Sequence, residues 1–197
     1  MTVRSPHVVA AVALLSLSIA CSQMSAPEGE VAADTMAGAV SAERGAYLVN
    51  TMGCHDCHTP FEMGPNGPEP NMTLALSGHP ETVTMGPVPA LDPASGWAWG
   101  GAGTNTAFFG PWGVSYSANI TSDENTGLGI WTEDMFVTAI REGKHMGTSR
   151  PILPPMPWPV FRNLTDDDLK SVFAYLKTVP AIANHVPEPV IAAPPAG

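Results

Sequence analysis

Three segments of the chain place apolar residues at the spacing of an amphipathic helix. The first begins after Ser41, a residue suited to the N-cap position, and continues to about Met52, where Gly53 follows as a stop signal. The second follows Thr132 as its N-cap and covers residues 133–142, with acidic residues in the first turn, where the helix dipole favours negative charge. The pattern therefore predicts a helix on each side of a long central segment.

The third segment has the strongest helical pattern. Thr165 and Asp168 have the spacing of a capping box, and the apolar residues that follow keep to one helical face until Pro180 ends the segment. In the first helix, Gly45 costs about 1 kcal/mol relative to Ala, so we expect it to lie at a close contact. The alternative is a tolerated surface glycine.

Residues 60–129, between the first two helical segments, show little helical or strand pattern. A loop of this length usually reflects either function or disorder. Its many aromatic residues argue against disorder, so we interpret it as folded, either as a cover over a functional group or as a separate aromatic core. The aromatic run consists of Trp97, Trp99, Phe108, Phe109 and Trp112.

The first twenty residues have the anatomy of an export signal. Arg4 precedes an apolar run over residues 8–20 that is too short to span a bilayer core of about 30 Å. Cys21 follows directly, in a context similar to the bacterial lipoprotein signal, in which the cysteine is lipidated and becomes the mature N-terminus. Ser18 departs from that pattern, which usually has Leu there, and the alternative is an ordinary signal with an incidental cysteine. We predict a lipoprotein-type signal over 1–20 with a lipid anchor on Cys21.

Composition divides the remainder of the chain. Residues 21–40 are small and polar, which predicts a flexible tether, and the 19 Gly and 21 Pro residues of the chain predict long irregular segments. We assign residues 41–182 to one folded domain and 183–197 to a Pro/Ala-rich tail. The formal net charge of −10 excludes binding to nucleic acid or to an anionic membrane through a basic patch.

The candidate chemistry is concentrated in Cys54-His55-Asp56-Cys57-His58. Cys-x-x-Cys-His is the attachment pattern for c-type haem, because two thiols add to the two haem vinyl groups and the adjacent imidazole reaches the iron as proximal ligand. A redox dithiol or half of a zinc site also uses Cys-x-x-Cys. The first does not need the histidine, and the second needs further ligands at close spacing. We therefore predict one covalently bound haem c on Cys54 and Cys57, with His58 on the iron.

On this motif and the helix before it, the chain resembles the cytochrome c family. In that family the first and last helices cross beside the haem, which implies a contact between Gly45 and the region of Tyr175. Residues 113–131 are similar to a stretch of the cytochrome c subunits of membrane-bound alcohol and aldehyde dehydrogenases and of their single-haem relatives. The resemblance implies an all-α cytochrome c fold of about three main helices around one haem, with the irregular 60–129 insertion covering it.

A low-spin electron carrier needs a sixth iron ligand, usually a thioether sulfur, which raises the reduction potential. Met156 stands among five prolines between residues 151 and 159. Prolines fix φ and remove backbone donors, so this loop is stiff and suits a weak iron–thioether bond. The resemblance agrees, because Pro-Pro-Met-Pro before the last helix matches the ligand loop of the family. We predict Met156 as the ligand, and the alternatives are Met146, His145 and His79.

The basic residues of the chain are unevenly distributed. None lies between residues 45 and 140, although the chain contains eight Lys and Arg. Guanidinium groups bind carboxylates through two hydrogen bonds, so one or two of the basic residues near the ligand loop are candidates to pair with the haem propionates. The alternative is a solvated face. These residues are Arg141, Lys144, Arg150 and Arg162.

These features predict a single-haem c-type cytochrome, exported and lipid-anchored on the periplasmic side of a bacterial membrane. It would transfer electrons between a redox donor and an acceptor by cycling between Fe(II) and Fe(III), as a carrier and not as an enzyme. One alternative is a permanent electron-transfer subunit of a membrane-bound dehydrogenase complex. Another is a haem sensor or catalyst with an open sixth site.

Overall fold

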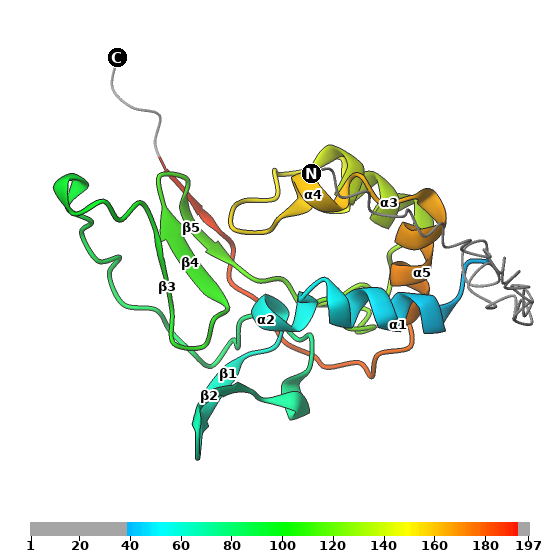
Figure 1. Cartoon of the computed structure of the whole chain (residues 1–197), viewed down its shortest axis with the longest axis horizontal. Coiled ribbons are helices and arrows are strands. Elements are labelled where there is room, and N and C mark those ends of the chain that lie inside the picture. The colour runs from blue at the N-terminus through cyan, green and yellow to red at the C-terminus, as the bar shows by residue number, and fades with distance from the viewer. Residues whose placement is uncertain (1–38, 193–197) are drawn as a thin grey trace, which may run out of the picture. The chain divides into compact units, whose positions relative to one another are not determined.

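The computed structural model describes residues 39–192 of the chain (Figure 1). The predicted signal, Cys21 and most of the predicted tether lie outside the described residues. Within residues 39–192, no helix is both long enough and apolar enough to cross a membrane. Figure 1 shows most of the helices gathered at one end of this part and the strands at the other.

The three predicted helices begin at the predicted N-caps. The hydroxyl groups of Ser41, Thr132 and Thr165 each accept a hydrogen bond from a backbone N–H in the first turn that follows. Asp168 does not complete the capping box, because its carboxylate accepts from Arg44 Nε at 2.9 Å. The helices are α1 (Ala42–Thr51), α2 (Cys54–His58), α3 (Glu133–Glu142), α4 (Trp158–Phe161) and α5 (Asp166–Leu176).

The prediction of an all-α fold was wrong, because the described residues also form six strands in two antiparallel sheets, so the fold is mixed α and β. One sheet is a hairpin, and the other has four strands in the order β3-β4-β5-β6. The strands are β1 (Phe61–Gly64), β2 (Gly67–Pro70), β3 (Gly100–Gly101), β4 (Ala107–Gly110), β5 (Gly113–Tyr116) and β6 (Val190–Ile191).

These strands are too short to show a period in the sequence. None is longer than four residues, β3 is a pair of glycines, and β4 is an apolar run without alternation. Their pairing depends on backbone hydrogen bonds, which carry little side-chain pattern. The segment predicted to be irregular therefore contains five of the six strands.

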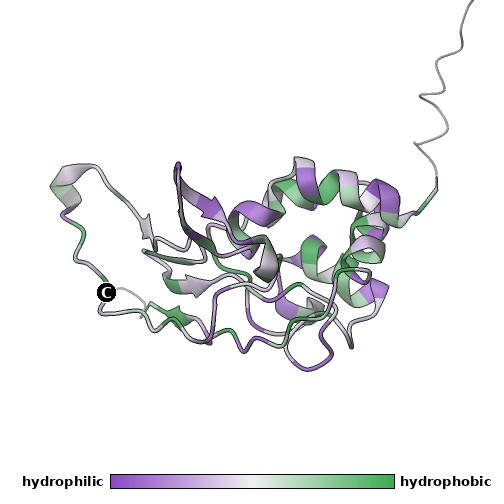
Figure 2. Cartoon of the chain, turned by 90° about the horizontal axis from the view of Figure 1, so that it is seen from below, coloured by the Kyte–Doolittle hydropathy of each residue, from purple (hydrophilic) through white to green (hydrophobic). Residues whose placement is uncertain are grey.

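The α1–α5 crossing forms the centre of the hydrophobic core. Gly45 is buried there, and a Cβ at this position would overlap the carbonyl oxygen of Ser171 and lie 2.7 Å from Tyr175 Cβ. The expected contact between the first and last helices is confirmed. Figure 2 shows that the helices carry both hydrophobic and hydrophilic residues, as amphipathic packing requires. The buried core includes Leu48, Val49, Phe136, Ile140, Leu169, Val172, Phe173 and Leu176.

The chain after α5 returns to the sheet. Asn184 is buried, and its side-chain amide donates to the carbonyl oxygens of Ser77 and His79 at 2.7 and 2.9 Å. The segment then pairs with β5 through β6. The described part of the predicted tail is thus packed against the domain, and it brings residues 185–189 to the functional site.

Candidate functional site

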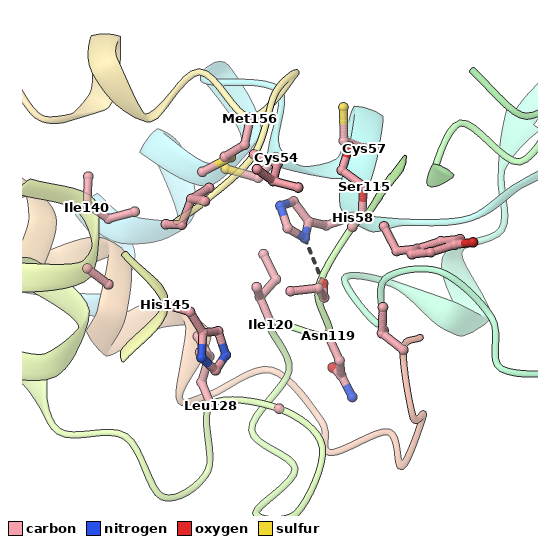
Figure 3. A pocket seen from close by; sticks show the side chains of 18 of the residues that line it. Cys54, Cys57, His58, Ser115, Asn119, Ile120, Leu128, Ile140, His145 and Met156 are labelled. Carbon is pink, nitrogen blue, oxygen red and sulfur yellow. Dashed lines mark hydrogen bonds between the residues drawn. The ribbon is translucent and has the colours of Figure 1, made fainter. Parts of the chain in front are cut away.

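A cavity of about 590 Å³ lies between the helices and the four-stranded sheet. This volume falls within the range of about 300–1,000 Å³ that is usual for ligand pockets. All four residues predicted to hold haem line it, namely Cys54, Cys57, His58 and Met156 (Figure 3). The sequence motif and the proline-rich loop, although distant in the chain, therefore meet at one site.

The backbone conformation of Gly53 places the motif beside this cavity. Gly53 adopts a left-handed conformation with φ of 69°, which favours glycine, and this residue separates α1 from the short helix α2 that carries the motif. Cys54 and Cys57 line the cavity, whereas His55 does not, and its Nδ1 lies 2.9 Å from the hydroxyl oxygen of Thr59. Asp56, the other variable position of the motif, lines the cavity together with both cysteines.

A hydrogen bond to the backbone fixes His58. Its Nδ1 lies 2.7 Å from the carbonyl oxygen of Ala118, and since a carbonyl only accepts, Nδ1 carries the proton (Figure 3). Burial is the largest cause that lowers the pKa of His58, which favours the neutral ring. The ring then presents a free lone pair on Nε2. A hydrogen bond from the ring nitrogen that does not bind the metal is the usual way in which proteins orient a metal-binding imidazole.

The two thiols do not have the character of a redox dithiol. Burial raises the pKa of Cys54 to about 11, and burial together with the charge of Asp56 raises the pKa of Cys57. Redox-active Cys-x-x-Cys pairs instead have lowered pKa values, because the thiolate is the reactive form. Within residues 39–192, no three His, Cys, Asp or Glu side chains are placed to bind a metal ion together. The raised pKa values of the two thiols therefore favour the haem interpretation over the redox dithiol.

The loop that carries Met156 is attached to the sheet. Ser115 on β5 donates from its hydroxyl to the carbonyl oxygen of Pro154 at 2.6 Å. Met156 is partly buried against the core and lines the cavity, and Figure 3 shows it facing the space around His58. A thioether and an imidazole are thus available to one bound group, which fits the donor set of a six-coordinate haem c.

Of the three alternative ligands, only His145 lines the cavity. His79 is fully buried elsewhere, and its two ring nitrogens bond to the Thr106 hydroxyl and the Val83 carbonyl. Met146 lies in a 3-10 turn after α3 and is absent from the lining. His145 packs edge-on against Trp131, with ring centroids 5.2 Å apart.

Part of the 60–129 segment lines the cavity, but Phe108 is the one aromatic residue of the run that does so. Phe108 on β4 and residues 115–120 line one wall. Trp97 and Trp99 lie outside the lining with 73% and 49% of their surface exposed, and Trp99 contacts Phe108 at 6.3 Å between ring centroids. The segment therefore combines a cavity wall with an exposed aromatic surface.

Two further contributors to the site have no signal in the sequence. The carbonyl of Ala118 orients His58, and residues 185–189 line the wall that the C-terminal segment supplies. A backbone carbonyl has no side-chain signature, and residues 185–189 belong to a segment whose composition indicated only a tail. Neither could be found from motif spacing.

Comparison with known proteins identifies relatives of one kind. No family model matches the chain. It is 38% identical to the fructose dehydrogenase cytochrome subunit of Gluconobacter japonicus over 72 residues. This aligned segment makes up 36% of this chain and 15% of that protein. It is 37% identical to the cytochrome c subunit of the quinone alcohol dehydrogenase of Gluconobacter oxydans over 82 residues. This aligned segment makes up 40% of this chain and 17% of that subunit. The chain resembles these cytochrome c subunits.

A third relative extends the resemblance. A nicotinate dehydrogenase subunit of Pseudomonas putida is 38% identical over 77 residues, which covers 39% of this chain and 6% of that protein. The chain thus spans less than a fifth of the length of these curated relatives. Cytochrome c relatives support a covalently bound haem c and an electron carrier in place of a catalytic subunit. They do not indicate the number of haems, and this chain contains one Cys-x-x-Cys-His motif.

Proposed function

We propose that this cytochrome carries one haem c and transfers electrons between redox partners. The observation that supports this most strongly is the convergence of Cys54, Cys57, His58 and Met156 on one cavity. Haem would supply a one-electron couple between Fe(II) and Fe(III). The chain supplies attachment, axial ligands and exclusion of water.

Each residue has a separate task in this proposal. Cys54 and Cys57 would hold the porphyrin by thioether bonds, and His58 would bind the iron through Nε2 while Ala118 keeps its ring in place. Met156 would supply a second ligand to the iron through its thioether sulfur, with its loop held by the bond from Ser115 to Pro154. Since none of these residues needs to move a proton or a substrate, the arrangement suits electron transfer better than a reaction at an open iron.

We further propose that the protein is exported to the periplasmic side of a bacterial membrane and held there by a lipid on Cys21. Its partners would be redox proteins, among them a membrane-bound dehydrogenase. The names of the relatives, which are subunits of dehydrogenases, favour a second form of this function, in which the chain is a permanent subunit of such a complex.

Covalent haem retention tests the central proposal. Protein produced with the haem-attachment machinery and then denatured should keep its haem, and its pyridine haemochrome should have the spectrum of two thioether bonds. The Cys54→Ala/Cys57→Ala double variant should lose all covalent haem, whereas His55→Ala, which changes a motif residue outside the cavity lining, should keep it. A wild-type haem that acidified organic solvent extracts would refute the proposal.

A further inference from the structure

Outside the Cys54–His58 motif, whose Asp56 also lines the cavity, the lining contains four Arg, His and Glu side chains. Arg150, His145, His185 and Glu188 all belong to the lining. Arg150 donates from Nε to the Glu188 carboxylate at 3.2 Å, and its carbonyl oxygen accepts from the backbone N–H of His145 at 2.9 Å. Figure 3 shows His145 on the far side of His58 from Cys57. One end of the cavity therefore carries the thiols, and the other carries this charged group.

The guanidinium of Arg150 has donors that form no hydrogen bond within the described residues. Within the described residues, its Nε reaches Glu188, and neither terminal nitrogen of its guanidinium has a hydrogen-bond partner. Trp131, which also lines this end and packs on His145, has an indole N–H that bonds to no other described residue. These donors border the cavity without being used by the fold.

The other basic residues near the ligand loop are placed differently. Arg141 bonds to the Arg162 carbonyl and to Asp166, and Arg162 lies over the Trp158 ring at 5.5 Å. Neither of them, nor Lys144, belongs to the cavity lining. Among the four basic residues singled out in the sequence, Arg150 alone can reach a group bound in the cavity.

The haem molecule has a matching arrangement, with the groups that react with thiols at one edge and its carboxylates at the other. The porphyrin carries its vinyl groups and its two carboxylates at opposite edges, so thioether bonds to Cys54 and Cys57 direct the carboxylates away from the motif. A guanidinium with two unused donors fits a carboxylate through parallel hydrogen bonds. The carboxylate edge of haem would thus meet the charged group of the cavity.

We infer that Arg150 binds the haem carboxylates and that Glu188, on the C-terminal segment, positions it there. The inference rests on the proposed function, since it requires a covalently held haem. The side chain of Glu188 is 84% exposed, so its ion pair with Arg150 contributes little stability. Its consequence is geometric and electrostatic, because it orients the guanidinium of Arg150 and adds a negative charge to the cavity lining.

Reduction midpoint potentials of the holoprotein test this assignment. Ferric haem carries one more positive charge than ferrous haem, so a nearby positive group favours Fe(II). Arg150→Gln should lower the potential, Arg150→Lys should lower it less, and Glu188→Gln should raise it. The matched controls are Lys170→Gln and Glu133→Gln, which remove the same charges from an exposed pair outside the lining, 3.4 Å apart on α5 and α3.

The outcomes separate the assignment from the proposed function. Opposite shifts at Arg150 and Glu188, each larger than its matched control and accompanied by unchanged covalent haem, support the assignment. Shifts no larger than those of the controls, in a protein that still holds covalent haem, overturn it and leave the proposed function intact. A protein without covalent haem overturns both.

Discussion

His58 shows how the site depends on residues that are remote in sequence. The motif identified it as a candidate ligand, because the adjacent Cys57 and His58 belong to one local pattern. Its orientation comes from Ala118, 60 positions away, and the Met156 loop is attached through Ser115, 39 positions from Pro154. Sequence reasoning could find the residues that would touch the haem, but it could not find the atoms that hold them in place.

In the proposed function, the electronic character of the site depends on Met156. Met156→Ala should leave the haem covalently bound but convert the iron to a high-spin or water-ligated state with a lower potential, because thioether ligation favours Fe(II). Visible spectra of the ferric protein and redox titration measure both effects.

The control is Met146→Ala, which removes an equivalent side chain outside the cavity lining. It should leave the spectrum unchanged and alter the free energy of unfolding by no more than about 0.5 kcal/mol. An unchanged spectrum in Met156→Ala would direct the search to His145, the one alternative candidate that lines the cavity.

Among the secondary-structure elements, the three main helices were predictable, whereas the short helix α4 and the strands were not. Thr132 and Gly143 bound α3 as expected, because capping is a local property of the sequence. By contrast, the glycine pair β3 and the short strand β4 depend on neighbours across the sheet. β6 pairs with β5 from a point in the chain that composition marked as a tail. The helical end of the fold therefore followed from the sequence, and the sheet that walls the site did not.

The close crossing of α1 and α5 leads us to predict that a larger residue at the contact lowers stability. Gly45→Ala should reduce the free energy of unfolding by about 1–3 kcal/mol, as overpacking does, since the backbone carbonyl of Ser171 occupies the space of the new methyl group. The gain of about 1 kcal/mol in helix propensity opposes this loss. Denaturant unfolding of the holoprotein measures the net change.

Asn50→Ala is the matched substitution in α1, because Asn50 is exposed and hydrogen-bonds only within the helix. It should change stability by about 0.5 kcal/mol or less. If Gly45→Ala proved more stable than the wild type by the full gain of about 1 kcal/mol in helix propensity, the close crossing of α1 and α5 would be wrong.

For the whole molecule, attachment to a membrane is expected to depend on Cys21, outside the described residues. Within residues 39–192 no helix can span a bilayer, and we propose a lipid on Cys21 as the anchor. Cys21→Ala should move the protein from the membrane fraction to the soluble periplasmic fraction without loss of haem. Fractionation followed by haem staining measures this, and Ser22→Ala serves as the neighbouring control. A Cys21→Ala protein that stays with the membrane would point to another anchor.

Residues 185–189, which form one wall of the cavity, are synthesised after the other residues of the site. The chain is synthesised from its N-terminus, so Cys54 and Cys57 are made before residues 185–189. Until residues 185–189 follow and β6 joins β5, the cavity remains open on one side. In the proposed function, haem attachment would therefore not require the complete chain, and the C-terminal segment would close this side of the pocket afterwards.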